Sequence, residues 1–216
     1  MSTLIAFLEH RGIDTVLDVG ANDGQFASSL RSMGYEGRIV SFEPISAVFA
    51  QLSDRAARDE RWVVRQLALG ARAEEAQINV SQNSVYSSLL PLTPLATEFD
   101  THAAVVRSET VRVARLDDIF SEFAGGRVFL KIDTQGFEQA VLEGGPQALT
   151  TILGVQLELP VEHLYADVWS LEDALAFMRG KGFVPAQIHP VNMLSDDPTA
   201  AIEFDVLFRR SAPGAS

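Results

Sequence analysis

The feature that most constrains the fold is a repeated alternation of short, almost continuous apolar runs with helical patterns of apolar residues. The first run is TVLDVG at 15–20, and Phe26, Leu30 and Met33 follow it at helical spacing. The second run is RIVSFEP at 38–44, and another amphipathic helical pattern comes after it. Further runs of this kind are WVVRQLALG at 62–70, RVFLKID at 127–133 and LGVQLELP at 153–160. Such runs are typical of strands buried on both faces in a parallel sheet.

The last two strand-like runs, FVPAQIHP at 183–190 and EFDVLFRR at 203–210, pair most simply as an antiparallel hairpin. We therefore predict an α/β, doubly wound, mostly parallel seven-stranded sheet with helices on both faces. Its predicted strand order is 3-2-1-4-5-7-6, with one antiparallel strand. Two shorter alternating runs, AQINVS at 76–81 and ETVRVARL at 109–116, predict half-exposed strands of hairpin type.

The length of 216 residues favours a single domain, which we place at 1–210, with a flexible tail at 211–216. An inserted, lid-like segment at about 76–116 interrupts the strand–helix alternation. Its central part, 82–108, contains two prolines and many hydroxyl groups but no sustained period. Irregular stretches of this length in compact domains are usually lids or binding loops. We expect a lid, with a disordered surface insertion as the alternative.

Composition excludes several classes of protein. With 47% hydrophobic and 21% charged residues, the chain is too apolar for disorder. Its 29 acidic and 17 basic residues give a net charge of −12, so nucleic acid and acidic membrane surfaces are not expected as partners. The lack of cysteine removes disulfides, zinc–thiolate sites and thiol nucleophiles. No run reaches the roughly 18 apolar residues of a membrane helix, and the start has no basic region, so we expect a cytoplasmic protein.

The loop after the first predicted strand, DVGANDGQF at 18–26, is a candidate ligand site because ligands bind at the carboxyl ends of parallel strands where the strand order reverses. Gly20 allows a tight turn and a close approach of the ligand, and Gly24 opens the next helix. Asp18 ends an apolar strand, where a carboxylate needs donors or a cation such as a ligand amino group. Alternatively, Asp18 accepts hydrogen bonds from the backbone of its own turn.

Glu43 ends the second predicted strand, at the spacing from Gly20 that is typical of the acid that accepts both ribose hydroxyls in nucleotide-binding α/β folds. The ligand is therefore expected to contain a nucleoside. A dinucleotide fingerprint has three glycines, whereas this loop has two, and Asn22 and Asp23 place bulk and negative charge where a pyrophosphate would lie. S-adenosylmethionine has no phosphate and carries two cationic groups, so it fits this loop better.

With these motifs the sequence resembles the FkbM-type S-adenosylmethionine-dependent methyltransferases, within the class I methyltransferase superfamily. The matching segments are VLDVGANDGQF, IVSFEP, LALG, the serine pair before Leu89, and LKIDTQGFEQAVLEG at 130–144. The resemblance covers about residues 15–160. It implies transfer of a methyl group from S-adenosylmethionine to a hydroxyl of a natural product, glycan or sugar-containing small molecule. With the loop glycines, it implies a cofactor site formed by Asp18, Gly20, Asn22, Gly24, Glu43, Pro44, Leu69, Gly70, Ser88 and Asp133.

Asp133 and Glu158 end two adjacent predicted strands and are the candidate catalytic carboxylates. Asp133 is expected to hold the cofactor ammonium, steer the acceptor or bind a metal, and its alternative role is to cap the following helix. Glu158 is either a carboxylate on the acceptor side of the site or an acid at a strand end without a functional role. An oxygen-ligand Mg²⁺ site formed by these two residues is an option, whereas a histidine-rich metal site is not indicated.

Three histidines, His102, His163 and His189, lie where they could border an acceptor pocket, although each is more often a solvated loop residue. His163 is a further catalytic candidate. Two rival functions are a nicotinamide-dependent oxidoreductase on a Rossmann-like sheet and a methyltransferase-like module without catalysis. The oxidoreductase would need a third glycine in the loop at 18–26, which has only two. A module without catalysis would not be expected to keep Glu43 and the two glycines of this loop.

Overall fold

The computed structural model describes residues 3–123, 125–194 and 197–211, so most of the predicted tail at 211–216 lies outside the described residues. The seven-stranded sheet has the order β3-β2-β1-β7-β8-β10-β9. Its strands are β1 Thr15–Val19, β2 Arg38–Phe42, β3 Trp62–Arg65, β7 Val128–Ile132, β8 Gly154–Pro160, β9 Phe183–Met193 and β10 Ala201–Arg210. Counted within this sheet alone, the order is the predicted 3-2-1-4-5-7-6. Only β10 runs antiparallel to its neighbours, β8 and β9, so the prediction of one antiparallel strand in this sheet is confirmed.

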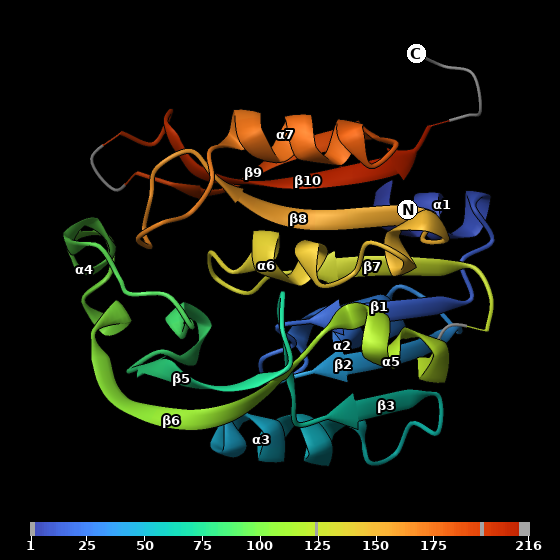
Figure 1. Cartoon of the computed structure of the whole chain (residues 1–216), viewed down its shortest axis with the longest axis horizontal. Helices are drawn as coiled ribbons and strands as arrows, with labels where there is room; N and C mark the ends of the chain where they lie inside the picture. The colour runs from blue at the N-terminus through green and yellow to red at the C-terminus, as the bar shows by residue number, and fades with distance from the viewer. Residues whose placement is uncertain (1–2, 124, 195–196, 212–216) are drawn as a thin grey trace.

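Helices cover both faces of the sheet, as predicted (Figure 1). The two sets of helices are α1 Thr3–His10, α2 Gln25–Ser32 and α3 Ser46–Ala56 on one face, and α5 Leu116–Phe123, α6 Glu138–Glu143 and α7 Leu171–Gly180 on the other. Successive strand residues point to opposite faces, so Val16 packs in the first layer and Leu17 in the second. None of the helices in the described ranges combines the length and the apolar character that a membrane crossing requires.

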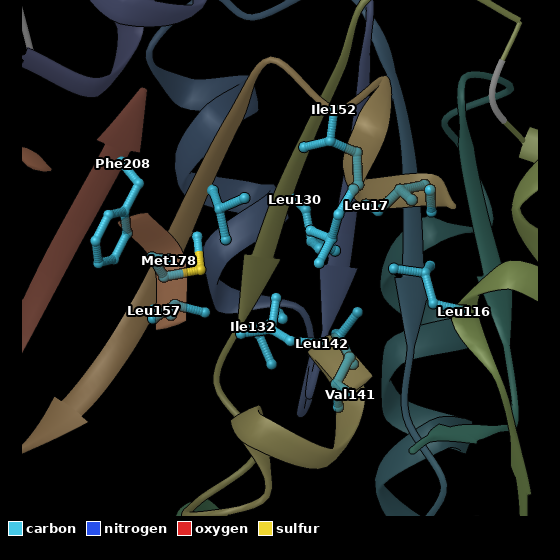
Figure 2. Close-up of a cluster of buried hydrophobic side chains, with 14 of the residues drawn as sticks. Leu17, Leu116, Leu130, Ile132, Val141, Leu142, Ile152, Leu157, Met178 and Phe208 are labelled. Atoms are coloured by element: carbon cyan, nitrogen blue, oxygen red, sulfur yellow. The ribbon is translucent and has the colours of Figure 1, made fainter. Parts of the chain in front are cut away.

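The larger of the two cores lies between the sheet and α5, α6 and α7. Figure 2 shows its central side chains, among them Leu130 and Ile132 from β7, Val141 from α6 and Met178 from α7, all of them fully buried. Burying one such side chain contributes about 1.5–3 kcal/mol. These layers hold the strand ends rigidly, which is the basis for any site built upon them.

A second, three-stranded sheet stands apart from the main one. It consists of β4 Ala68–Leu69, β6 Val105–Ala114 and β5 Glu74–Ser81 in that spatial order, and β5 and β6 are antiparallel as their alternation predicts. The predicted single strand at 62–70 is wrong, because β3 ends at Arg65 and the next two residues to pair, β4, join the second sheet. The predicted strand at 109–116 also ends too late, because β6 ends at Ala114 and Leu116 begins α5.

The segment 82–108 is folded. It forms the short helices η1 Ser84–Tyr86, α4 Pro94–Phe99 and η2 Thr101–Ala103, and the first part of β6. Ala96 and Ala103 are buried in a small cluster with Tyr165 and Ile202, which anchors the segment to the main domain. Figure 1 shows α4, β5 and β6 beyond the arrowheads of the parallel strands. The segment therefore covers the end of the sheet where the candidate site was predicted, and its opening as a lid stays a prediction.

Candidate functional site

A cavity of about 370 Å³ opens at the carboxyl ends of the parallel strands, which is the size of a typical small-ligand site. Its wall combines the loops after β1, β2 and β7 with strand residues of β8, β9 and β10 and with the segment 84–89. The predicted site residues on the wall are Gly20, Asn22, Glu43, Pro44, Leu69, Asp133 and Glu158. The prediction of a ligand site at this end of the sheet therefore corresponds to a real cavity.

Two glycines shape the loop after β1. Gly20 has a φ of 75°, and a Cβ there would collide with the backbone carbonyl of Asp133, so only glycine brings these two strand ends together. Gly24 has a φ of 92° at the start of α2 and packs against the ring of Trp62. Gly24 does not line the cavity. Its role is to set the direction of α2, and Gly20 forms the wall itself.

Glu43 is buried, with 5% of its surface exposed, and lies on the cavity wall. Its carboxylate accepts hydrogen bonds from the backbone N–H of Ile45 at 2.8 Å and of Asn22 at 3.1 Å. Burial raises the pKa of Glu43 to about 7, and these two donors only partly offset that effect. Each carboxylate oxygen keeps a further lone pair, so the residue can accept two more hydrogen bonds from a ligand.

Asp18 is fully buried behind the wall and is not part of it. Its carboxylate accepts a hydrogen bond from the Ser41 hydroxyl at 3.0 Å and lies 3.3 Å from the Lys131 ammonium. Neither sequence-based role, ligand contact or a cap for its own turn, corresponds to this placement. A buried lysine partly offsets the burial of this carboxylate, because β1 and β7 are neighbours and Asp18 pairs with Lys131 in register. Burial nevertheless raises the pKa of Asp18.

Lys131 is one of the site residues that sequence reasoning missed. Its ammonium reaches Asp133 at 3.2 Å and the Gly20 carbonyl at 3.3 Å, and it lies 5.3 Å from the centre of the Phe26 ring. Burial opposes the charge, but the carboxylates of Asp133 and Asp18 raise the pKa of Lys131, so it stays charged. The signal was present: a lysine inside the apolar run VFLKI needs a buried anion as partner.

Asp133 and Glu158 share one amide donor. The Gln135 side chain donates to Asp133 Oδ1 at 2.8 Å and to Glu158 Oε2 at 2.9 Å. Burial alone would raise the pKa of Asp133, but Lys131 and Gln135 bring it below its usual value. Burial and the negative charge of Asp133 raise the pKa of Glu158 well above its usual value. The structure therefore brings together two carboxyl groups whose pKa values are shifted in opposite directions.

Capping does not explain Asp133, so that alternative is wrong. Helix α6 begins at Glu138 with Phe137 as its N-cap and without a capping side chain. The carboxylate that accepts from the turn before α6 belongs to Glu138, which takes the N–H groups of Thr134 and Gly136. Asp133 is left to face the cavity and Lys131.

Several other predicted residues do not line the cavity. Gly70 packs against the Phe137 ring, and Ser88 is buried and donates its hydroxyl to the Gln135 carbonyl at 2.6 Å. The suggestion that histidines border the pocket is wrong, because His102, His163 and His189 are exposed and absent from the wall. His163 contributes only its carbonyl, to the Thr93 hydroxyl. No histidine side chain is therefore in place to act as a base in the cavity.

Four polar residues complete the far end of the cavity, and none was proposed from the sequence: Gln156, Asn192, Glu203 and Asp205. They come from β8, β9 and β10, and Asn192 donates to Glu203 at 2.6 Å. Asp205 pairs in register with Glu158, so two strand-end acids lie side by side. The signal was the position of Glu203 and Asp205 at the start of an otherwise apolar strand.

Across the described residues, no group of three or more His, Cys, Asp or Glu side chains is placed to hold a metal ion. Asp133 and Glu158 instead share an amide donor, and the ammonium of Lys131 already neutralises one of them. The option of a Mg²⁺ site at this pair therefore gains no support.

The sheet is mostly parallel, a glycine turn follows its first strand, and an acid follows its second strand. These features define a Rossmann-like protein of the nucleoside-binding type. Similar folds occur in Aeropyrum pernix fibrillarin with natively bound S-adenosyl-L-methionine (TM-score 0.51, 12% identity, 95% of this chain and 74% of that one). The methyltransferase domain of bacterial CtHen1-C is also similar (0.50, 12%, 97% and 96%). A third is the Streptococcus pneumoniae protein Sp1610 in complex with S-adenosyl-L-methionine (0.50, 11%, 100% and 76%).

The family follows from the sequence model of the methyltransferase FkbM domain, which matches residues 18–185, well over half of the chain. The chain belongs to this family and is an S-adenosylmethionine-dependent methyltransferase, as its motifs imply. A comparison with curated proteins finds no match.

Proposed function

We propose that the protein transfers the methyl group of S-adenosylmethionine to a hydroxyl oxygen of a natural product, glycan or other sugar-containing small molecule. The observation that carries the proposal is the pair formed by Asp133 and Glu158, two carboxyl groups with opposite pKa shifts on one cavity that also contains Glu43. Titratable pairs driven apart in this way are typical of acid–base sites.

The cofactor would occupy one end of the cavity. Glu43 would accept both ribose hydroxyls, and the apolar wall at Leu67 and Leu69 would contact the adenine. The loop at Gly20 and Asn22, with Asp133 beside it, would enclose the amino-acid part. When bound, S-adenosylmethionine supplies an electrophilic methyl group on a sulfonium.

Asp133 is the proposed proton acceptor. As the acceptor oxygen forms its bond to the methyl carbon, the oxygen becomes positively charged and its proton becomes strongly acidic. Even a carboxylate with a lowered pKa can then take that proton, and the products are a methyl ether and S-adenosylhomocysteine. Glu158, whose pKa is raised well above its usual value, is the proposed holder of the pair's proton and would donate a hydrogen bond that orients the acceptor.

The far end of the cavity suits a hydroxyl-rich acceptor. Gln156 and Asn192 offer amide groups and Glu203 and Asp205 offer carboxyl groups, which together can donate to and accept from several hydroxyls. Among the described residues of the wall, Lys131 is the only cation, and two carboxylates already neutralise it. A phosphate-rich acceptor such as nucleic acid would therefore meet a negative surface.

The experiment is a methylation screen. The protein is incubated with S-adenosylmethionine and separate panels of methyl glycosides, amino sugars, phenols, amines and a short RNA, and S-adenosylhomocysteine release and acceptor mass are recorded. We expect a gain of one methyl group only on hydroxyl-bearing small molecules, in the presence of a chelator as well as of Mg²⁺. Methylation confined to RNA or to amine nitrogen would refute oxygen transfer to a small molecule.

A further inference from the structure

Gln135 has a backbone conformation that its residue type does not favour. Its φ is 56°, in the left-handed region, and Gly136 follows with a φ of 95°. Glycine adopts this region without cost and asparagine tolerates it, whereas a longer side chain is strained there. Strain of this kind persists where the surrounding structure compensates it, and it clusters at functional sites. The contacts of Gln135 supply this compensation.

All polar groups of that side chain are used. The amide nitrogen donates to Asp133 Oδ1 at 2.8 Å and to Glu158 Oε2 at 2.9 Å, and the amide oxygen accepts from the Tyr165 hydroxyl at 2.7 Å. The orientation of the amide is therefore fixed. A flipped amide would turn its oxygen toward two carboxyl groups and its N–H groups toward the hydroxyl proton.

The same residue is tied to the segment 82–108. The Ser88 hydroxyl donates to the Gln135 carbonyl at 2.6 Å, and the Tyr165 hydroxyl also lies 3.2 Å from the carbonyl oxygen of Tyr86. Ser88 and Tyr165 are both buried, with 2% and 3% of their surface exposed. Water therefore competes weakly for these bonds, and Gln135 connects the acid pair directly with the segment that covers the cavity.

We propose that Gln135 is a positioning residue for the methyl transfer: it holds Asp133 and Glu158 as one pair with a single proton and couples that pair to the segment 82–108. This inference rests on the proposed function, because it assigns the pair to the chemistry. Two N–H groups directed at two carboxyl oxygens favour the ionised form of Asp133 and keep Glu158 next to it, where only one of the two can ionise.

The test uses Gln135→Gly, which removes the amide but suits the left-handed backbone. The matched control is Gln139→Ala on α6, where the lost bond is an exposed one to Glu143 at 2.9 Å. Carboxyl ¹³C shifts are followed against pH and assigned with Asp133→Asn and Glu158→Gln. We expect the titration of Asp133 to move upward by about 1 pH unit or more, as expected for losing one hydrogen bond to a charged group, and the control to leave it in place.

Hydrogen exchange in the same samples measures the coupling. We expect exchange in 84–90 to become about tenfold faster in Gln135→Gly and to stay unchanged in the control. Tyr165→Phe, which removes only the hydroxyl donor, should shift both readouts in the same direction by less, and it serves if the glycine variant does not fold. Binding of S-adenosylhomocysteine should persist in each variant, because Gln135 is bonded to the acid pair and not to Glu43, the proposed ribose contact.

A lower melting temperature with unchanged titration and exchange would reduce Gln135 to a structural role and overturn the inference. Loss of S-adenosylhomocysteine binding in Gln135→Gly would also overturn it, since the amide would then support the whole cavity. Failure of the proposed function is separate, because it would appear as absent binding in the unmodified protein or as a different acceptor in the methylation screen.

Discussion

Charged groups cut off from water determine the chemistry of this site one residue at a time. Lys131 lies between Asp18 and Asp133, and each of these carboxylates has a second donor, from Ser41 and from Gln135 respectively. Glu43 has only backbone donors, and burial raises its pKa to about 7. Burial also raises the pKa of Asp18, whereas Lys131 and Gln135 bring the pKa of Asp133 below its usual value. Neighbouring carboxyl groups therefore differ in pKa because their immediate partners differ.

The first prediction concerns Glu43. Replacing it with glutamine should weaken binding of S-adenosylhomocysteine by roughly 10-fold to 100-fold, because two hydrogen bonds to a charged acceptor are worth about 1.5 kcal/mol each and the amide retains one of them. Calorimetric titration measures this. The control is Glu36→Gln, at an exposed glutamate whose side chain is 83% accessible. Equal affinity in both variants would remove the ribose assignment.

The same residue predicts a pH dependence of binding. The ionised form of Glu43 accepts the ribose hydroxyls, and its pKa of about 7 means that acidification protonates it within the physiological range. We expect affinity for S-adenosylhomocysteine to rise from pH 6 to pH 8, by at most about tenfold per pH unit below the pKa. Glu43→Gln should abolish this slope. A slope that survives the substitution would assign the titration to another group.

A further prediction separates the two acid-pair residues. Asp133→Asn should lower turnover by about 100-fold or more, because the proton acceptor is lost, and Glu158→Gln should lower it less, because the amide can still donate a hydrogen bond. Turnover is measured with an acceptor identified by the methylation screen. Asp18 stays paired with Lys131 in both variants, so the fold should survive. Full activity of Asp133→Asn would remove this residue from the chemistry.

At the scale of single residues, spacing along the chain predicted which positions end the strands, and Gly20, Glu43 and Asp133 lie on the cavity as expected. It did not predict that Asp18 turns behind the wall. That placement depends on Lys131, which is far away in sequence and becomes a neighbour only through the pairing of β1 with β7. A buried charge pair of this kind becomes predictable once the strand register is known.

At the scale of elements, N-cap residues mark where two of the helices begin. Ser170 is the N-cap of α7 and accepts from the N–H of Asp173, a position that serine favours. Thr93 and Pro94 are the N-cap and first residue of α4, a common helix start that the apparent lack of period in 82–108 concealed. The division of 62–70 into β3 and β4 had no local signal, because it depends on which sheet each part can pair with.

The turn between β7 and α6 gives a prediction at this scale. The buried Glu138 carboxylate accepts from the N–H and hydroxyl of Thr134 and from the N–H of Gly136. Glu138→Ala should therefore lower the free energy of unfolding by about 1–3 kcal/mol, because three donors lose their shared acceptor, and denaturant titration measures this. The control is Glu143→Ala at the exposed end of the same helix, which should change stability by less than about 0.5 kcal/mol.

The cost of Glu138→Ala should depend on pH. Burial raises the pKa of Glu138 from 4.5 to about 7, so the folded state binds a proton that the unfolded state releases. Its contribution to stability is complete below about pH 4.5 and is lost as the pH rises through 7. The substitution should therefore cost most near pH 5 and least near pH 8. A cost that stays constant from pH 5 to pH 8 would mean that Glu138 is ionised throughout this range.

At the scale of the whole molecule, the cavity lies between two separate sheets. The main sheet supplies the strand ends, and the second sheet and the segment between β5 and β6 close the opposite side with Ile78, Ser84 and Leu89. The main sheet order was predictable because each of its parallel connections is a strand–helix unit with one allowed hand. The place of the second sheet was not, because β5 and β6 pair across the long segment between them.

The last prediction tests the identity of the ligand on the whole fold. A ligand that binds only the folded state stabilises it by about 2.7 kcal/mol at 100 times its Kd, and for a domain of 216 residues this corresponds to a rise in Tm of about 5–10 °C. We expect S-adenosylhomocysteine to raise Tm by this amount and NAD to leave it unchanged, because the loop after β1 has no third glycine for a pyrophosphate. Glu43→Gln should reduce the shift at the same ligand concentration, since it lowers affinity and leaves the cavity in place. A shift with NAD and none with S-adenosylhomocysteine would instead support the nicotinamide-dependent oxidoreductase and contradict the assignment of Glu43 and Asp133 to methyl transfer.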